Sequence, residues 1–514
     1  MFDPAEAPDV EVYAVHGVEP EIQAYAMAKY SRSALSMKES LDEISAQKAE
    51  KFLNTFYFQY GHRSIADLAH LAFAIERLSI LAAIAVVDEQ RWDGQERSTR
   101  YQDFKKSGYH VPDFAPDEES AALYRDTLDA LFGEYQAVSQ SMWEYLQSRV
   151  PLREGMKTED YERTLRARAF DVARYLLPLA TNTSLGQLVS ARTLENQVTR
   201  LLSHTHPEVR ALGEKLKQAA REPAYIPRTA KFQELEQEIR GRDKLWWKNV
   251  YEIFNPETRV APTLVKYADP SPYDMETRRD LRQAAAELMR QAVPTPAPAV
   301  DLLDDEPIEI ELAATLLYEH CHYPYRQLRD AVAALPEKRR DELVNLGVRH
   351  RGAHDELLRP YCAGHKFRFD ILMDIGAYRD LHRHRRCIQI GQGFTTQHGY
   401  ETPDDLAAAG LCDRYDALMK RAAAAQAQLA RAATPDAAAK SEYAIPLAYR
   451  KRTLFKMDFA EVVYIAELRT APAGHFSYRR IAWEMYQVVA RRHPSLAAYF
   501  RATDPSANVD LLKR

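Results

Sequence analysis

The sequence lacks several features that would mark a specialised class of protein. Glycine occurs only 18 times in 514 residues, and there are four cysteines. All four lie in the second half, with no CxxC pair and no regular spacing: Cys321, Cys362, Cys387 and Cys412. This pattern indicates neither a disulfide framework nor a zinc site, so we expect no metal and a reducing, cytoplasmic compartment.

A dominant charge and a long apolar run are also missing. Lys and Arg total 69 against 74 acidic residues, which gives a formal net charge of −5. That balance gives no electrostatic case for bulk binding of nucleic acid or of an anionic membrane surface. The first ten residues, MFDPAEAPDV, are acidic, and no apolar run approaches the roughly 18 residues of a membrane helix. We therefore expect a soluble protein without a membrane partner.

What the chain does have is length and an abundance of helix-forming residues. A chain of 514 residues exceeds what one hydrophobic core usually organises, so two domains of about 250 residues are expected. The hydrophobic content of 46% and charged content of 28% are ordinary for a globular protein. Segments rich in Ala, Leu, Glu and Arg favour a helix-rich fold.

Apolar spacing predicts the individual elements. Helices are expected at residues 21–30, 46–60, 118–149 and 275–292, and in a broken series from 161 to 250. Strands are expected at 11–17 and 259–267, and residues 67–87 read as a strand entering a buried helix. Asn255-Pro256 marks a turn, and we place the domain boundary there. The proline-rich, acidic residues 293–307 are expected to form an exposed loop; the alternative is that they are the interdomain linker.

Two landmarks indicate that the halves are copies of each other. The first is an xPL tripeptide, Leu177-Pro178-Leu179 in one copy and Ile445-Pro446-Leu447 in the other. A histidine follows each proline at nearly the same distance, His206 and His475. Where the first copy has Arg174 and Arg192 around its proline, the second has Glu442 and Ala460.

The second landmark is a hydrophobic segment that begins with phenylalanine, at residues 73–87 and 369–382. Only the second copy follows it with a basic run, Arg383-His384-Arg385-Arg386, where the first has Asp88-Glu89-Gln90. The first copy continues into the polar cluster Glu96, Ser98, Arg100 and Tyr101, where the second offers GQGFTTQHGY. Each half therefore lacks the cluster that the other keeps.

These residues resemble the flavin-dependent thymidylate synthases. That family has the signature RHRxxSxNExSxRY, a GH dipeptide upstream and two arginines around an LPL segment downstream. The first copy matches the dipeptide at Gly61-His62, the ExSxRY part at Glu96, Ser98, Arg100 and Tyr101, and the arginines at Arg174 and Arg192. The second copy matches the RHR at Arg383, His384 and Arg385. The similarity is good around residues 61–112, 171–206 and 369–403, and only topological elsewhere.

The resemblance implies an α+β fold of two tandem domains, each helix-rich with a small central β-sheet. Residues 1–256 would carry a nucleotide half-site and residues 257–514 a flavin half-site. Because family members share their active sites between subunits of a tetramer, the fused chain is expected to form a homodimer that imitates the tetramer. Complementary loss is tolerable in such an assembly, since each composite site needs one of each cluster.

The resemblance also implies roles for single residues. Glu96, Ser98, Arg100 and Arg174 would bind the phosphate and sugar of dUMP, and guanidinium groups suit phosphate because they bind it bidentately. Arg192 would lie near the uracil carbonyls and stabilise charge developing on the ring, so Arg192 and Ser98 are the catalytic candidates. Arg383, His384 and Arg385 would bind FAD, and His62 would lie near the folate.

The implied reaction is reductive methylation of dUMP to dTMP with FAD, NADPH and methylenetetrahydrofolate, and it requires no protein nucleophile. One alternative is flavin-dependent alkylation of another pyrimidine nucleotide or of a nucleic-acid uridine. Another is a non-catalytic protein that binds nucleotide or flavin. Each motif also has a plainer interpretation: a capping serine beside a surface ion pair for Ser98, and a solvated charge run for residues 383–386.

Overall fold

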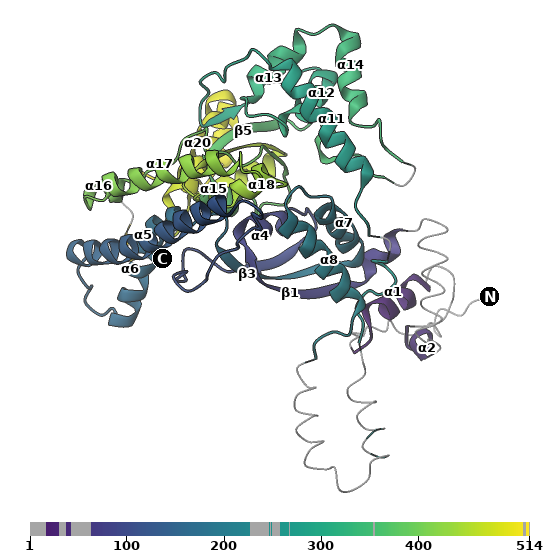
Figure 1. Cartoon of the computed structure of the whole chain (residues 1–514), viewed down its shortest axis with the longest axis horizontal. Helices are drawn as coiled ribbons and strands as arrows, with labels where there is room; N and C mark the ends of the chain where they lie inside the picture. Colours follow the sequence, from purple (N-terminus) through teal and green to yellow (C-terminus); the bar gives the residue numbers. More distant parts are fainter. Residues whose placement is uncertain are drawn as a thin grey trace, which may run out of the picture. The chain divides into compact units, whose positions relative to one another are not determined.

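The computed structural model describes residues 17–29, 37–42, 63–226, 246, 248, 258–266, 268–352, 355–506 and 510–512 (Figure 1). The chain forms two compact units. The first consists of residues 1–73, 188–199 and 213–269, and the second of residues 74–187, 200–212 and 270–514. None of the helices in these ranges has the length and hydropathy needed to span a bilayer.

The chain combines many helices with two small sheets, of which the second is antiparallel, and this confirms the predicted α+β class. The first half contains α1 (Pro20–Lys29), α2 (Met37–Asp42), η3 (Arg63–Leu68), β1 (His70–Ser79), α4 (Ile80–Val87), β2 (Asp93–Glu96), α5 (Glu118–Arg149), α6 (Thr158–Ala173), η4 (Arg174–Leu176), β3 (Asn182–Ser190), α7 (Ala191–Leu202) and α8 (Pro207–Arg221). Its strands form a sheet in the order β1-β3-β2.

The second half repeats this plan with additional helices. It contains α11 (Pro272–Leu288), β4 (Val300–Leu302), α12 (Ile308–Tyr318), α13 (Tyr325–Ala333), α14 (Glu337–Leu346), η5 (Arg359–Tyr361), β5 (Phe367–Asp374), α15 (Ile375–Leu381), β6 (Ile388–Gly391), α16 (Asp404–Ala408), α17 (Cys412–Leu429), α18 (Ala437–Glu442), β7 (Arg450–Met457), α19 (Phe459–Thr470), α20 (Phe476–Arg492) and η6 (Pro494–Tyr499). Its strands form an antiparallel sheet in the order β4-β5-β7-β6.

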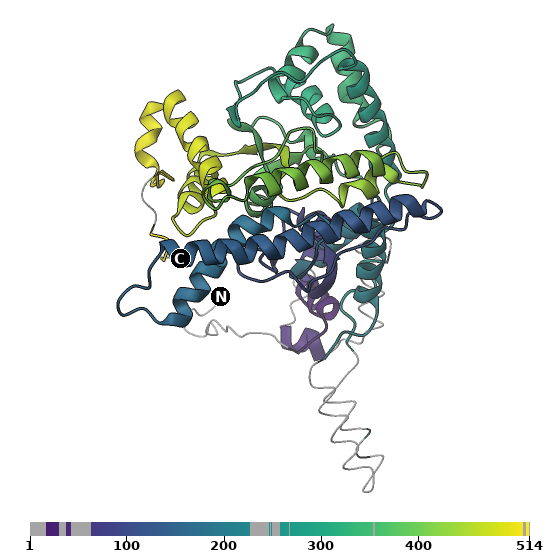
Figure 2. The same ribbon diagram turned by 60° about the vertical axis from the view of Figure 1, so that its left-hand side comes forward.

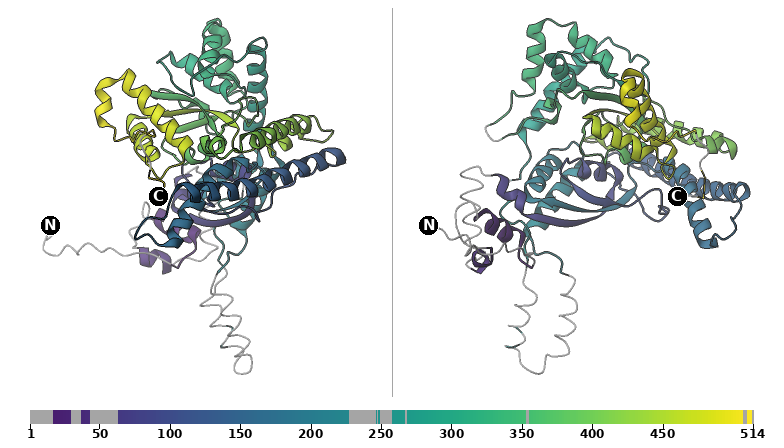
Figure 3. Two further views of the ribbon diagram at one scale, coloured as in Figure 1. Left: turned by 90° about the vertical axis from the view of Figure 1, so that its left-hand side faces the viewer. Right: turned by 180° about the vertical axis from the view of Figure 1, so that it is seen from behind.

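Helices cover the second sheet and pair across the repeat within the second unit. Helix α20 packs on β4 and β5 (Figure 3). The long helix α5 of the first copy packs beside α17 of the second (Figure 2). Helices α11 to α14 enclose an apolar core with side chains of β6 and β7, including Leu281, Leu316, Leu317, Leu328, Ile390 and Leu454.

The two xPL tripeptides meet in a reciprocal antiparallel bridge centred on Pro178 and Pro446. The Leu179 N–H donates to the Ile445 carbonyl at 2.9 Å, and the Leu447 N–H donates to the Leu177 carbonyl at 3.0 Å. Each donor therefore has its counterpart in the other copy as donor in an equivalent bond. The internal repeat inferred from these tripeptides thus reappears as a local twofold relation within the second unit. We call this contact the xPL seam.

The strand-to-helix corners are also equivalent. Ser79 ends β1 and caps α4 by accepting the Ala82 N–H at 2.9 Å, while Asp374 ends β5 and caps α15 by accepting the Ala377 N–H at 2.7 Å. Each cap has a partner two residues after the histidine that follows the xPL tripeptide of its copy, His206 or His475. Ser79 Oγ donates to Glu208 at 2.6 Å, whereas Asp374 accepts from Ser477. The hydroxyl and the carboxylate have exchanged places between the copies.

Several predicted elements are confirmed. Helix α5 spans the predicted residues 118–149, α1 and α11 occupy the regions predicted to be helical, and β1 leads into the wholly buried α4. The predicted helix at 46–60 and strand at 11–17 lie outside the described residues, apart from Gly17.

Three predictions were wrong. In the predicted strand at 259–267, Arg259 forms an isolated bridge with Pro223, and residues 262–266 form a turn. The Thr263 and Leu264 N–H groups donate to the Glu21 carboxylate instead of to a neighbouring strand. Strand β3 interrupts the helical series predicted from residue 161, and its alternating burial explains why the helical interpretation fails there. The predicted loop 293–307 contains β4, which pairs with β5 at the sheet edge.

The exchanged caps generate a stability prediction. Ser79→Asp places a second carboxylate against Glu208, so we expect a loss of about 1–3 kcal/mol in the free energy of unfolding. Adding Glu208→Ser recreates the Asp374–Ser477 pairing and should recover part of that loss. Urea unfolding of the single and double variants measures the coupling. A double variant no more stable than Ser79→Asp alone would contradict the equivalence of the two corners.

Candidate functional site

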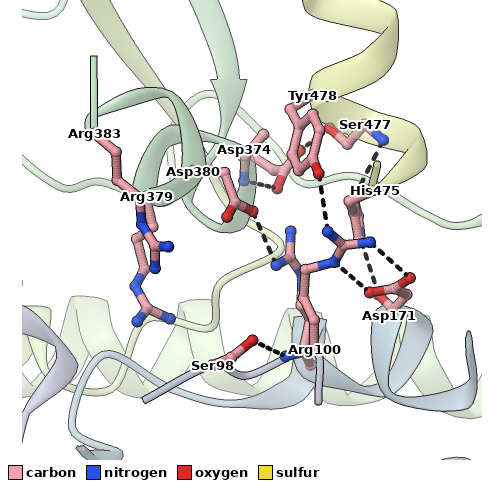
Figure 4. A network of polar contacts seen from close by, with 12 residues as sticks. Ser98, Arg100, Asp171, Asp374, Arg379, Asp380, Arg383, His475, Ser477 and Tyr478 are labelled. Atoms are coloured by element: carbon pink, nitrogen blue, oxygen red, sulfur yellow. Dashed lines mark hydrogen bonds and ion pairs between the residues drawn. The ribbon is translucent and has the colours of Figure 1, made fainter. Parts of the chain in front are cut away.

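Arg100 anchors a buried polar cluster in the second unit (Figure 4). Its Nε donates to Asp171 Oδ1 at 2.7 Å, and its Nη1 donates to the Tyr478 hydroxyl at 2.9 Å. Burial opposes the charged guanidinium, but the Asp171 carboxylate outweighs it and raises the pKa of Arg100. Ser98 Oγ accepts the Arg100 backbone N–H at 3.2 Å and so shapes the turn after β2.

Arg174 is the second buried arginine of the cluster, with only 2% of its surface exposed. It belongs to η4, just before the xPL seam, and its Nη1 donates to Asp380 Oδ2 at 3.2 Å. Its Nε and Nη2 are buried and have no hydrogen-bond partner among the described residues. The guanidinium group is therefore paired in charge but keeps two unused donors.

Asp380 lies on α15, and the positive charges of several arginines stabilise its ionised carboxylate. Burial alone would raise the pKa of its carboxyl, but Arg174, Arg383, Arg100 and Arg469 together lower it below the usual value. Asp380 is thus ionised at neutral pH. Two of these arginines, Arg100 and Arg174, belong to the first copy, and the other two belong to the second, so both copies contribute positive charge near this carboxylate.

Glu96 joins the two sequence clusters. It ends β2 in the first copy, and it pairs with Arg379 and, at 3.6 Å, with Arg383 of the second copy. The ExSxRY residues of one copy and the RHR residues of the other therefore meet within a single chain. Glu96 is the carboxylate that bridges them.

His384 and Arg385 have different surroundings from Arg383. His384 is buried; Arg469 Nε donates to its Nε2 at 2.8 Å, so its Nδ1 carries the proton and donates to Glu461 at 3.2 Å. Both ring nitrogens are thus engaged within the chain. Arg385 lies over the Trp92 ring at 4.4 Å, and its Nε has no partner among the described residues.

The other two predicted site residues do not belong to the second unit. Arg192 belongs to the first unit, where its Nη1 pairs with Asp67 at 3.3 Å. His62 lies outside the described residues. Of the predicted residues, Glu96, Ser98, Arg100, Arg174, Arg383, His384 and Arg385 belong to the second unit.

The corresponding place in the repeat has lost its arginines. Asp88, the counterpart of Arg383, pairs with Arg359 at 2.6 Å and with His382 at 3.1 Å. Burial would raise the pKa of Asp88, but Arg359 and His382 hold it far below the usual value. Glu442, the counterpart of Arg174, lies 3.2 Å from His206.

Lysine and histidine side chains fill the rest of that place. Gly391 is the counterpart of Glu96, and a Cβ built on it would lie 3.0 Å from Lys451 Cε. Gly393 is the counterpart of Ser98, and a Cβ built on it would lie 3.7 Å from Cε1 of the His322 ring, an ordinary van der Waals contact. Burial lowers the pKa of Lys451 to about 8, and its amine packs 4.3 Å from the centroid of the Phe394 ring. The repeat therefore holds one arginine-rich cluster and one filled counterpart.

Sequence reasoning missed the acidic partners of the cluster and some of its donors. These residues are Asp171, Asp380, Arg379, Arg469 and Tyr478. His475 marked the repeat in the sequence, but its contact was not foreseen: its Nε2 lies 2.9 Å from the Asp171 carbonyl oxygen. Arg379 and Asp380 directly precede the basic run, so its helical continuation could have identified them. Nothing in the sequence near Arg100 points to Tyr478.

Comparison with known proteins gives a consistent result. The family model described as "Thymidylate synthase complementing protein" (Thy1) matches residues 14–224 and 302–495, which are two regions as a tandem requires. The chain is 28% identical to a UPF0159 protein of Chlamydia muridarum over 97% of this chain and 93% of that protein. It is 25% identical to a flavin-dependent thymidylate synthase of Clostridium tetani over 34% of this chain and 68% of that protein.

A solved structure aligns with less than half of the chain. The flavin-dependent thymidylate synthase ThyX of Helicobacter pylori, complexed with FAD and dUMP, aligns at 18% identity with a TM-score of 0.27. The alignment covers 39% of this chain and 89% of that one.

The buried His384 contact generates a pH prediction. Burial, aided by Arg469 and Arg385, outweighs Glu461 and lowers the pKa of His384, so below about pH 6.5 the unfolded chain binds a proton that the folded chain does not. Stability from this residue is present above that pH and is lost as the pH falls. His384→Gln, which keeps a donor and an acceptor, should reduce the dependence of unfolding free energy on pH between 7 and 5. The reduction is at most about 1.4 kcal/mol per pH unit. Urea unfolding at pH 5, 6 and 7 measures it, and an unchanged slope would refute the neutral imidazole.

Proposed function

The chain belongs to the Thy1 family of flavin-dependent thymidylate synthases, and from that premise we propose that it methylates dUMP at a composite site formed within each chain. The single observation that carries the proposal is the Glu96 bridge between Arg379 and Arg383, because it joins the half-site of one copy to that of the other. Arg100 and Arg174 extend the same cluster toward the xPL seam.

Charge and hydrogen bonding support binding of the nucleotide phosphate at this cluster. Among the described residues, the arginines Arg100, Arg174, Arg379, Arg383 and Arg469 face four carboxyl groups, those of Asp171, Asp374, Asp380 and Glu96. A net positive site suits a phosphate dianion, and guanidinium groups offer paired donors to it. Arg174 supports this role because its Nε and Nη2 have no partner among the described residues and could donate to a phosphate. Ser98 and Arg100 would then orient the sugar side of the ligand.

The basic run fits a flavin nucleotide. Arg383 is 37% exposed in its side chain, and Arg385 keeps an unpartnered Nε beside Trp92, so both can meet a diphosphate. His384, held by Glu461 and Arg469, would fix the backbone of the run between them. Bound FAD would supply the redox chemistry of methylation, with NADPH as reductant and methylenetetrahydrofolate as one-carbon donor. Arg192 is proposed as the group that polarises the uracil and His62 as a folate contact.

The filled counterpart supports one site per chain. The Asp88–Arg359 pair, the Glu442–His206 pair and Lys451 occupy the positions that a second arginine cluster would need. We propose tandem domains of residues 1–256 and 257–514, and a homodimer that carries two nucleotide sites where a tetramer of single copies would carry four.

A first experiment tests the activity. We expect the purified protein to bind FAD and dUMP and to release tritium from 5-labelled dUMP when supplied with methylenetetrahydrofolate and NADPH. Competition by other pyrimidine nucleotides and by uridine-containing RNA in this assay separates dUMP from the alternative substrates. Colourless protein that takes up neither FAD nor dUMP would overturn the proposal in favour of a non-catalytic role.

Arg174→Ala tests the site itself. Removing the two free donors and one charge should weaken dUMP binding by about 10- to 100-fold. Arg163→Ala, which removes an arginine with 79% of its side chain exposed, is the matched control and should bind as the wild type does. Isothermal titration calorimetry measures both. Equal affinity of Arg174→Ala and wild type would place the phosphate elsewhere.

Stoichiometry tests the filled counterpart. We expect one dUMP bound per chain in the same titrations. Two bound nucleotides per chain would contradict the loss of the second site.

A further inference from the structure

The two buried arginines of the cluster are held in different ways. Arg100 makes a bidentate contact with Asp171 and also donates to Tyr478 and to the Ala473 carbonyl. Arg174 donates to Asp380 at 3.2 Å, and its Nε and Nη2 have no partner in the part of the chain that the structure describes. A structural ion pair in a buried position normally satisfies its donors, because unsatisfied buried donors are costly. The Arg174–Asp380 pair is therefore poorly optimised as a structural contact.

The backbone of α15 packs closely against the guanidinium group of Arg174. Gly376 lies in the first turn of α15, and a Cβ built on it would lie 3.2 Å from Arg174 Nη2. Any larger residue would crowd this unpartnered donor. The absence of a side chain at Gly376 leaves room for Nη2 beside the α15 backbone and the Asp374 carboxyl group, yet Nη2 has no hydrogen-bond partner among the described residues.

Asp380 also carries a full negative charge at this place. Its side chain is 14% exposed, and the surrounding arginines keep it ionised. A phosphate that reached the free donors of Arg174 would come close to this carboxylate. Two like charges a few ångströms apart in a partly desolvated site repel strongly.

We propose that Asp380 tunes the affinity of the site by competing with the ligand phosphate for Arg174. In the ligand-free protein its carboxylate neutralises the guanidinium group, and in the complex it opposes the phosphate dianion. It thereby limits the affinity of the site for nucleoside monophosphates, substrate and product alike. The identity of the nucleotide rests on the proposed function. The expected sign of the effect, weaker phosphate binding in the presence of the Asp380 carboxylate, rests on the Arg174–Asp380 contact alone.

Asp380→Asn tests the proposal because it removes the charge and keeps the shape. We expect dUMP to bind at least about tenfold more tightly to the variant than to wild type at low ionic strength, with the difference shrinking as salt rises. Asp380→Glu keeps the charge and should not gain affinity. Asp160→Asn, which removes a carboxylate from an exposed pair with Arg163, is the matched control and should bind as wild type.

Inorganic phosphate serves as a second probe that needs no nucleotide chemistry. The rise in Tm with phosphate concentration should be larger for Asp380→Asn than for wild type and for Asp160→Asn. If Asp380 instead positions Arg174 for the ligand, the Asn variant will bind dUMP and phosphate more weakly, and the proposal is overturned.

The remaining outcomes separate the two proposals. Wild type that binds dUMP while Asp380→Asn gains nothing refutes the role of Asp380 and leaves the proposed function intact. Wild type that ignores dUMP while the Asn variant gains phosphate stabilisation supports the role of Asp380 and refutes the nucleotide function. No response of either protein to either ligand refutes both.

Discussion

The xPL seam is the contact on which the arrangement of the second unit depends. Its reciprocal hydrogen bonds place Pro178 against Pro446. A second reciprocal pair lies beside them, in which the Ala180 N–H donates to the Tyr443 carbonyl and the Ala448 N–H donates to the Tyr175 carbonyl. Backbone groups buried at such a centre must be paired, so the two segments fix each other in register. Arg174 lies three residues before Leu177, and its position follows from the seam.

The strand-to-helix corners extend this relation to the cluster. The Leu81 N–H donates to the Leu179 carbonyl, and the Gly376 N–H donates to the Leu447 carbonyl. Helix α15 is thereby tied to the seam, and it carries Arg379 and Asp380 on its last turns. The counterpart α4 presents Ile84 and Ala85 at the equivalent positions, both buried. A common backbone thus supports a charged corner in one copy and an apolar corner in the other.

Much of this could be predicted from the sequence. Helix α5 has regular apolar spacing over its whole length, and the tripeptides gave the frame of the repeat. The meeting of Glu96 with Arg383 was predicted in outline, since each copy keeps what the other lacks. The family and the tandem arrangement are confirmed by the two matched regions. The domain boundary and the role of each site residue stay predictions.

What the sequence could not provide are contacts set by tertiary structure. Asp171 and Tyr478 are separated by about three hundred residues, and both contact Arg100. Glu21 satisfies backbone donors that a pattern of apolar residues would assign to a strand. Strand β4 has three residues and gains its identity from pairing with β5, not from its own propensity.

The exchanged caps restrict the order in which the copies diverged. Starting from either pairing, a single replacement at one corner leaves two carboxylates or two hydroxyls facing each other. Two hydroxyls still form an O–H···O bond and carry no charge, whereas two buried carboxylates repel. The passable route between Ser79–Glu208 and Asp374–Ser477 therefore runs through a serine facing a serine. An intermediate on this route would hold the corner with two uncharged hydroxyl groups.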